Sequence, residues 1–206
     1  MSNTPLKLRK TVVPISFGIE IEGRNSRLRT KTYDHIGFFF ITTDGSLGYS
    51  NSIELVSQPL PPKMLIRCLE TMKKRHGEIS SEDSAGIHIH VTKTPKVEKR
   101  MIELYNWIRE NRERWVIQNF FGRNPNLYCR AHWDMTAVRF ERYSAINFRN
   151  EHTIEVRLFG NNDPTYNGIE SGVCFIKRLN AVLSSKETIT TQFMETICSK
   201  YPRIPT

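Results

Sequence analysis

The segment Phe17–Gly23 (FGIEIEG) decides the expected fold, because apolar and polar residues alternate along it. A period of two is typical of a β-strand with one buried face and one polar face. The segment Ala85–Val91 (AGIHIHV) repeats this pattern, with His88 and His90 at the polar positions. A sheet that contains both strands would present glutamate and histidine on one face.

The rest of the chain predicts a mixed architecture. Alternation or continuous apolar character predicts further strands over 35–43, 52–57, 143–148 and 153–159. Apolar residues at helical spacing predict helices over 62–76, from Thr94-Pro95 to about residue 120, over 168–184 and over 187–199. The long central helix is expected to carry one apolar stripe, formed by Val97, Met101, Leu104, Ile108 and Trp115.

The order of these elements indicates the fold class. Strands and helices do not follow a strict βαβ order, which favours an antiparallel sheet. We expect an α+β protein with a single domain over 1–206, a curved, mostly antiparallel sheet and helices on one face. The motif-bearing core spans about 15–160, and the C-terminal helices span 168–199.

Composition restricts the possible partners and location. The chain has 206 residues, of which 30 are Lys or Arg and 21 are Asp or Glu, so its formal net charge is +9. This excess favours an anionic partner such as a nucleotide, a nucleic acid or an acidic peptide. No secretory signal or membrane span is evident, and a cytoplasmic location is expected. Four separated cysteines are then reduced thiols: Cys68, Cys129, Cys174 and Cys198.

The expected polar face of the sheet has an unusual composition. It holds Glu20, Glu22, Glu54, His88, His90, Glu155 and Arg157. An ordinary solvated face explains a single ExE or HxH motif, but it would sample lysine and threonine freely. Carboxylates gathered this closely raise one another's pKa unless cations lie between them. Oxygen-rich ligation with one histidine favours Mg²⁺ or Mn²⁺ over zinc.

Seven short segments between residues 17 and 159 occur in a characteristic order: FGIEIE, DGSLG, SIELVSQPL, AGIHIHV, GRNPNLYC, RYSAINF and TIEVRLF. Together they resemble the glutamine synthetase-like carboxylate–amine ligases, and most closely the small amidoligase family of phages and bacteria. The resemblance implies a glutamine synthetase-like catalytic domain that binds ATP with Mg²⁺ or Mn²⁺. The metal ligands that it implies are Glu20, Glu22, Glu54, His88 and Glu155.

The resemblance also implies roles for cationic residues. His90 would lie near an ATP phosphate, and Arg157 would bind the phosphoryl group during transfer. Arg123 and Arg130 would assist Arg157. The basic run 23–31, which includes Arg24, follows the ExE strand; it either closes over ATP or an acidic substrate, or is a plain exposed loop.

The implied chemistry is ATP-dependent formation of an amide or peptide bond through an acyl phosphate. Glu151 and Asp44 are candidates for the base that deprotonates the amine, and a turn-capping role explains each of them equally well. The substrates would be a small-molecule or peptide carboxylate and an amine. No membrane partner is expected, and no oligomeric state is predicted. If the chain is encoded by a phage, its location would be the cytoplasm of the bacterial host.

Two alternatives stay open at this point. One is an amino-acid ligase closer to glutamate–cysteine ligase, with the same sheet and metals. The other is a protein that binds nucleic acid or a host factor and uses the ligase scaffold without turnover. The aromatic and basic segment 132–143 would suit nucleic acid, although a strand or loop at the rim of the active site is favoured for it. The intact set of acids and histidines favours the ligase.

Overall fold

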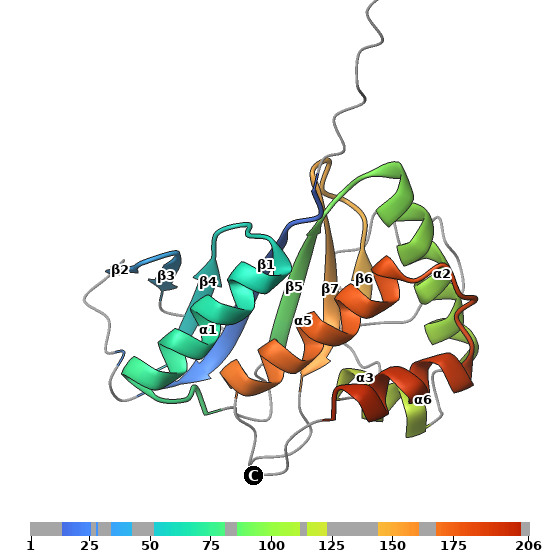
Figure 1. Ribbon diagram of the computed structural model, residues 1–206. Helices are drawn as coiled ribbons and strands as arrows, with labels where there is room; N and C mark the ends of the chain where they lie inside the picture. Colours follow the sequence, from blue (N-terminus) through green and yellow to red (C-terminus); the bar gives the residue numbers. More distant parts are fainter. Residues whose placement is uncertain are drawn as a thin grey trace, which may run out of the picture.

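The computed structural model describes residues 14–25, 28, 34–42, 52–80, 86–111, 115–122, 144–160 and 168–202, with only the backbone over 34–36. Within these residues, seven strands form one sheet in the order β2-β3-β4-β1-β5-β7-β6 (Figure 1). The strands are β1 (Phe17–Arg24), β2 (Asp34–Ile36), β3 (Phe39–Thr42), β4 (Ser52–Ser57), β5 (Gly86–Thr92), β6 (Ile146–Asn147) and β7 (Thr153–Gly160). Every neighbouring pair is antiparallel, which confirms the predicted α+β sheet.

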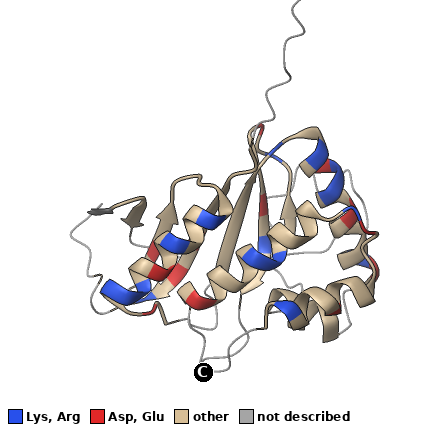
Figure 2. Cartoon of the chain, in the orientation of Figure 1, with Lys and Arg blue, Asp and Glu red and all other residues tan. Residues whose placement is uncertain are grey.

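One face of the sheet is covered by helices. The described helices are α1 (Pro62–His76), α2 (Pro95–Asn111), α3 (Trp115–Phe121), α5 (Gly168–Ser184) and α6 (Thr191–Lys200). In Figure 1, α1 and α5 cross the sheet side by side, and α3 and α6 pack together near one end of it. Lys and Arg are spread over the outer turns of α1, α2 and α5 in Figure 2, with acidic residues among them.

The alternation in β1 decides which of its faces meets the helices. Ile19 and Ile21 are fully buried beneath α5, whereas Glu20 and Glu22, which alternate with them, stay partly exposed on the other face. Two glycines of α5 permit the close contact, because a Cβ at position 172 would lie only 2.7 Å from Ile19 Cδ1. A buried helix layer on one side therefore leaves the polar side chains of the sheet on the opposite side.

Several predicted helices are confirmed, and two differ in extent. The helix predicted over 187–199 is α6, which begins only at Thr191 because Thr190 caps it by accepting the Phe193 N–H (3.1 Å). Helix α1 spans the predicted 62–76, and α2 begins at the predicted Thr94-Pro95, where the Val97 N–H donates to Thr94 Oγ1 (3.2 Å) and caps the helix. The expected long helix consists of α2 and α3 in the described residues, and Trp115 is 63% exposed. Its stripe ends at Ile108 because α3 buries a new set of side chains, Val116, Ile117, Phe120 and Phe121.

Two predicted strands also differ from the structure. The expected strand 35–43 is a hairpin, in which Gly37 adopts a φ of 62° between β2 and β3. Glycine reaches this conformation without steric cost, so an apolar run that looks continuous can still turn. The expected strand 143–148 is reduced to the two residues of β6, with Asn147 opposite Glu155.

Arg178 connects the helices on the covered face. It is 1% exposed and is the largest fully buried side chain among the described residues. Its guanidinium donates to the carbonyls of Tyr201 (2.8 Å), Asn119 (2.6 Å) and Phe120 (2.8 Å). It therefore links α5 to the carboxyl ends of α3 and α6. None of the described helices combines the length and the apolarity needed to cross a membrane.

Candidate metal site

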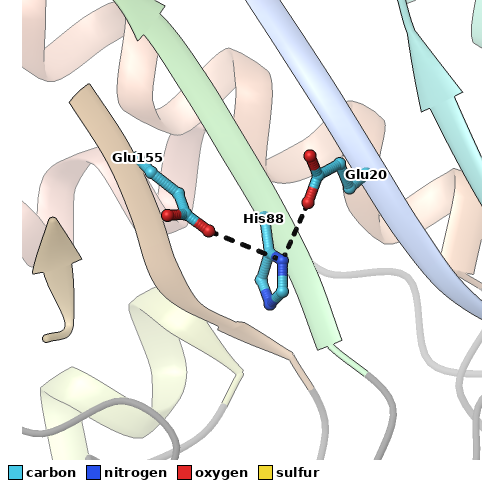
Figure 3. A group of neighbouring side chains, drawn as sticks. All are labelled: Glu20, His88 and Glu155. Carbon is cyan, nitrogen blue, oxygen red and sulfur yellow. Dashed lines mark hydrogen bonds and ion pairs between the residues drawn. The ribbon is translucent and has the colours of Figure 1, made fainter. Parts of the chain in front are cut away.

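Glu20, His88 and Glu155 converge on the sheet face that the helices leave uncovered (Figure 3). They come from the neighbouring strands β1, β5 and β7, and Glu20 lies directly opposite His88 in the register. His88 Nδ1 is 3.1 Å from Glu20 Oε2 and 3.7 Å from Glu155 Oε1. One ligand atom from each residue lies within 4.8 Å of the other two.

Glu22 extends this group of acids toward β4. Its register partner on β4 is Glu54, so these two residues occupy the same face on adjacent strands. Glu22 Oε2 accepts the Gly86 N–H (2.8 Å), while Oε1 lies 3.9 Å from His88 Nε2. The predicted metal ligands on β1, β4, β5 and β7 thus form a continuous band across four adjacent strands.

A β-bulge sets the position of Glu155. Ile87 pairs with Phe159 and Ile89 with Val156, so β7 contains one residue more than β5 over this stretch. Glu155 is paired with His90 and reaches His88 diagonally. Arg157 lies two residues further along β7, and its Nη1 donates to Glu155 Oε1 (2.5 Å).

The histidines control the charge state of Glu20. Burial raises the pKa of Glu20, but the hydrogen bonds and charges of His88 and His90 outweigh burial and hold that pKa well below its usual range. His90 Nε2 is 3.0 Å from Glu20 Oε1. Burial lowers the pKa of His90, and its contacts with the carboxylates of Glu20 and Glu155 raise it overall against an opposing effect of Arg157. In the metal-free protein Glu20 is therefore an anion that is shared by two imidazoles.

An open polar pocket of about 470 Å³ lies beside the three converging residues. It is lined by Glu20, His90, Asn147, Arg149, Asn150, Thr153, Glu155 and Arg157. The pocket combines carboxylates that suit a cation with two guanidiniums that suit an anion. Such a combination suits a ligand in which metal and phosphate are bound together.

Four of these lining residues were missed by the sequence reasoning: Asn147, Arg149, Asn150 and Thr153. They lie in β6, in the turn that follows it and at the start of β7. The turn is held by Lys93, whose Nζ donates to the carbonyls of Phe148 (3.1 Å) and Asn150 (3.3 Å). The signal in the sequence is that Asn147 belongs to the segment RYSAINF and Thr153 begins the segment TIEVRLF, two of the seven segments quoted above.

The remaining predicted site residues lie apart from this pocket or outside the described residues. Arg24 lies at the end of β1, where its backbone bridges to Ser80, and it does not line the pocket. Glu151 is exposed in the β6–β7 turn and does not line the pocket either. Asp44, Arg123 and Arg130 lie outside the residues that the structure describes.

The donor atoms fit a small divalent cation. Octahedral Mg²⁺ or Mn²⁺ sites have metal–oxygen distances of about 2.1 Å, which place adjacent ligand atoms about 3 Å apart. The separations of 3.1 and 3.7 Å around His88 Nδ1 are close to this value. His88 Nδ1 and Glu20 Oε2 lie within hydrogen-bonding distance (3.1 Å), and a bound cation would replace this direct contact.

Comparisons with known proteins add little to this geometry. No family model and no curated protein matches the chain. Among solved structures it is similar to a bifunctional glutathione synthetase from Pasteurella multocida, with 10% sequence identity and a TM-score of 0.38. The match covers 91% of this chain and 41% of that chain, so this chain spans less than half of the enzyme. A similarity of this size carries no argument about function, and membership of the amidoligase family stays a prediction.

Proposed function

We propose that the protein is an ATP- and divalent-metal-dependent carboxylate–amine ligase. The observation that carries this proposal is the convergence of Glu20, His88 and Glu155 within 4.8 Å, next to a pocket that contains Arg157. Acids, an imidazole and a guanidinium in one pocket supply both parts of a metal–phosphate site. The sequence contains no P-loop, so ATP binding would use this sheet face.

In this proposal Glu20, His88 and Glu155 hold one cation, and Glu22 and Glu54 contribute to a second cation toward β4. Bound Mg²⁺ or Mn²⁺ would neutralise the charge on the phosphate oxygens. Arg157, which is anchored on Glu155, would bind the γ-phosphoryl group through its planar guanidinium. His90 and Arg149 line the same pocket and would contact other phosphate or carboxylate oxygens.

The reaction then has two bond exchanges. An oxygen of the substrate carboxylate attacks the γ-phosphorus, the bond to ADP breaks, and an acyl phosphate forms. An amine nitrogen attacks the acyl carbon, and inorganic phosphate leaves with the electrons of the C–O bond. The nitrogen gives up one proton to a base. Glu151, although exposed in the β6–β7 turn, and Asp44 stay candidates for that base.

Binding of Mn²⁺ and ATP tests the site before the substrates are known. We expect ATP to bind the wild-type chain measurably more tightly with Mn²⁺ than with EDTA, in equilibrium dialysis and as a rise in Tm. Glu155→Gln should lose this dependence, because the amide cannot supply a second anionic ligand. Glu187→Gln is the matched control, since Glu187 is exposed in the loop before α6.

A screen for ADP release then tests the activity. The wild-type chain is incubated with Mg²⁺ and ATP over amino acids, peptides and polyamines, and products are identified by mass spectrometry. Arg157→Lys should reduce ADP release by roughly 100-fold or more, because lysine cannot form the two-pronged contact to phosphoryl oxygens. ATP binding that is equal with and without Mn²⁺ in the wild type contradicts the proposal, and so does tight DNA binding that nucleotide leaves unchanged.

A further inference from the structure

Asn147 is the residue that fixes the orientation of the Glu155 carboxylate. It lies in β6 directly opposite Glu155 in β7, and its Nδ2 donates to Glu155 Oε2 (3.0 Å). The other end of the amide is also engaged, because Asn147 Oδ1 accepts the Arg149 N–H (3.0 Å). The backbone thus determines which end of the amide faces Glu155.

The two oxygens of Glu155 consequently have different surroundings. Oε1 is the oxygen that approaches His88 Nδ1 (3.7 Å), and it also accepts from Arg157. Oε2 accepts from Asn147. A carboxylate oxygen has two acceptor positions, so Oε1 can accept from Arg157 and still bind a cation. Glu155 therefore presents one oxygen to the site while Asn147 retains the other.

A carboxylate that presents one oxygen suits some cations better than others. Mg²⁺ and Mn²⁺ prefer six ligands in a regular octahedron, and one oxygen from each carboxylate meets that preference. Ca²⁺ takes six to eight oxygen ligands and commonly binds both oxygens of a glutamate. Restraining Oε2 therefore disfavours Ca²⁺ at the site, while the fixed orientation of Oε1 favours the smaller cations.

We propose that Asn147 is a positioning residue that selects Mg²⁺ and Mn²⁺ over Ca²⁺ by holding Glu155 as a one-oxygen ligand. This inference rests on the proposed function, because it assumes that Glu20, His88 and Glu155 bind a cation. It adds a residue from β6 to the site and assigns a role to part of the RYSAINF segment. The hydrogen bond to Oε2 keeps the carboxylate from rotating both of its oxygens toward the ion.

The test compares cation affinities of Asn147 variants in the full chain. Mn²⁺ binding is followed by electron paramagnetic resonance, and Ca²⁺ binding by competition against Mn²⁺. Loss of a partner that orients a metal ligand typically weakens binding by about 10- to 100-fold. Asn147→Ala should therefore weaken Mn²⁺ by about this factor and Ca²⁺ by much less, so that the preference for Mn²⁺ falls at least about fivefold.

Two further variants separate positioning from general stability. Asn147→Asp keeps the acceptor for the Arg149 N–H but cannot donate to Oε2, so it should also lose the preference for Mn²⁺. Asn111→Ala is the structural control, because Asn111 Nδ2 donates to the Trp107 carbonyl (2.8 Å) within α2. It should lower Tm and leave the ratio of the two affinities unchanged.

The possible outcomes distinguish this inference from the proposed function. A wild-type chain that binds neither Mn²⁺ nor Ca²⁺ overturns the proposed metal site itself. A wild-type chain that binds Mn²⁺, with both affinities unchanged in Asn147→Ala, overturns only the role of Asn147. Equal loss of both affinities overturns the selectivity, because it would show that Asn147 supports the site without discriminating between cations.

Discussion

Glu20 and His90 form an ion pair whose effect on stability depends on pH. The pKa of Glu20 is lowered on folding, so this group stabilises the protein above its unfolded pKa of 4.5 and loses that effect in acid. The pKa of His90 is raised on folding, so its contribution is complete below its unfolded pKa of 6.5 and disappears as the pH rises through its folded pKa. The pair therefore stabilises the metal-free protein most between about pH 4.5 and 6.5.

We expect the metal-free chain in EDTA to be more stable at pH 6 than at pH 8, in urea unfolding monitored by circular dichroism. His90→Gln should reduce the difference between the two pH values, because glutamine does not titrate. Lys73→Gln is the comparison, since Lys73 of α1 forms ion pairs with Glu78 and with Glu170 of α5, and its raised pKa affects stability only at strongly alkaline pH. A pH difference that His90→Gln leaves intact would falsify the assignment to this ion pair.

The junction between α3 and β7 depends on a glycine. Gly122 has a φ of 86° just after α3, and a Cβ there would lie 2.0 Å from the carbonyl oxygen of Gly160 at the end of β7. The positive φ and the contact are separate obstacles to a side chain. The end of the strand that carries Glu155 and Arg157 is thus packed against the end of a helix.

Gly122→Ala is expected to destabilise the protein by about 3–5 kcal/mol, from about 1–2 kcal/mol of backbone strain and a larger cost of moving a carbonyl. Gly77→Ala is the matched control, because Gly77 also has a positive φ (80°) and nothing within 4 Å of an added Cβ. It should cost only about 1–2 kcal/mol. Equal free energies of unfolding for the two variants, measured in urea, would show that the close approach of Gly160 is unimportant.

The two faces of the sheet have different roles: the helix-covered face provides stability, and the uncovered face carries the candidate metal site. Arg178 satisfies three carbonyls at the ends of α3 and α6 from the covered side. The candidate metal site lies on the other side of β1, β5 and β7. A substitution at Arg178 should therefore alter the stability of the whole molecule without altering the intrinsic affinity of the site.

Arg178→Met keeps most of the side-chain volume and removes every donor. Leaving buried carbonyls unsatisfied costs about 1–3 kcal/mol each, so we expect a loss of about 3–5 kcal/mol and a fall in Tm of roughly 10 °C. Mn²⁺ affinity at a temperature where the variant is folded should equal that of the wild type. Arg67→Met, at an exposed position on α1, should change neither quantity. If Arg178→Met lowered Tm by less than about 2 °C, the hydrogen bonds from Arg178 to these carbonyls would not be important for stability.

The sequence was sufficient for features that depend on local periodicity. The alternation in β1, β4, β5 and β7 predicted which side chains share the polar face, including Glu20, His88 and Glu155, because every second residue of a strand points the same way. The antiparallel arrangement followed from the order of the elements. The distances between these side chains depend on the register between strands. A single sequence does not specify that register.

The errors arose where tertiary contacts override local pattern. Trp115 continued an apolar stripe in the sequence, but α3 buries a different face of its own. The turn at Gly37 was hidden within an apolar run. Asn147 was missed because its role depends on pairing between β6 and β7, which brings an amide opposite Glu155. Predicting a positioning residue requires knowledge of its hydrogen-bond partner as well as of its residue type.

The bulge in β7 makes the number of residues in that strand part of the site. Phe159 stacks on Phe175 and contacts Phe121 inside the core, with ring centroids 4.7 and 5.1 Å apart. Deleting Leu158 would force either this aromatic cluster or the Glu155–Arg157 pair onto the wrong face of the sheet. The spacing from the Glu155–Arg157 pair to Phe159 is therefore as informative as the pair itself. If the Glu155–Arg157 pair were introduced into a strand of another sheet, the extra residue of the β-bulge would have to be introduced with it.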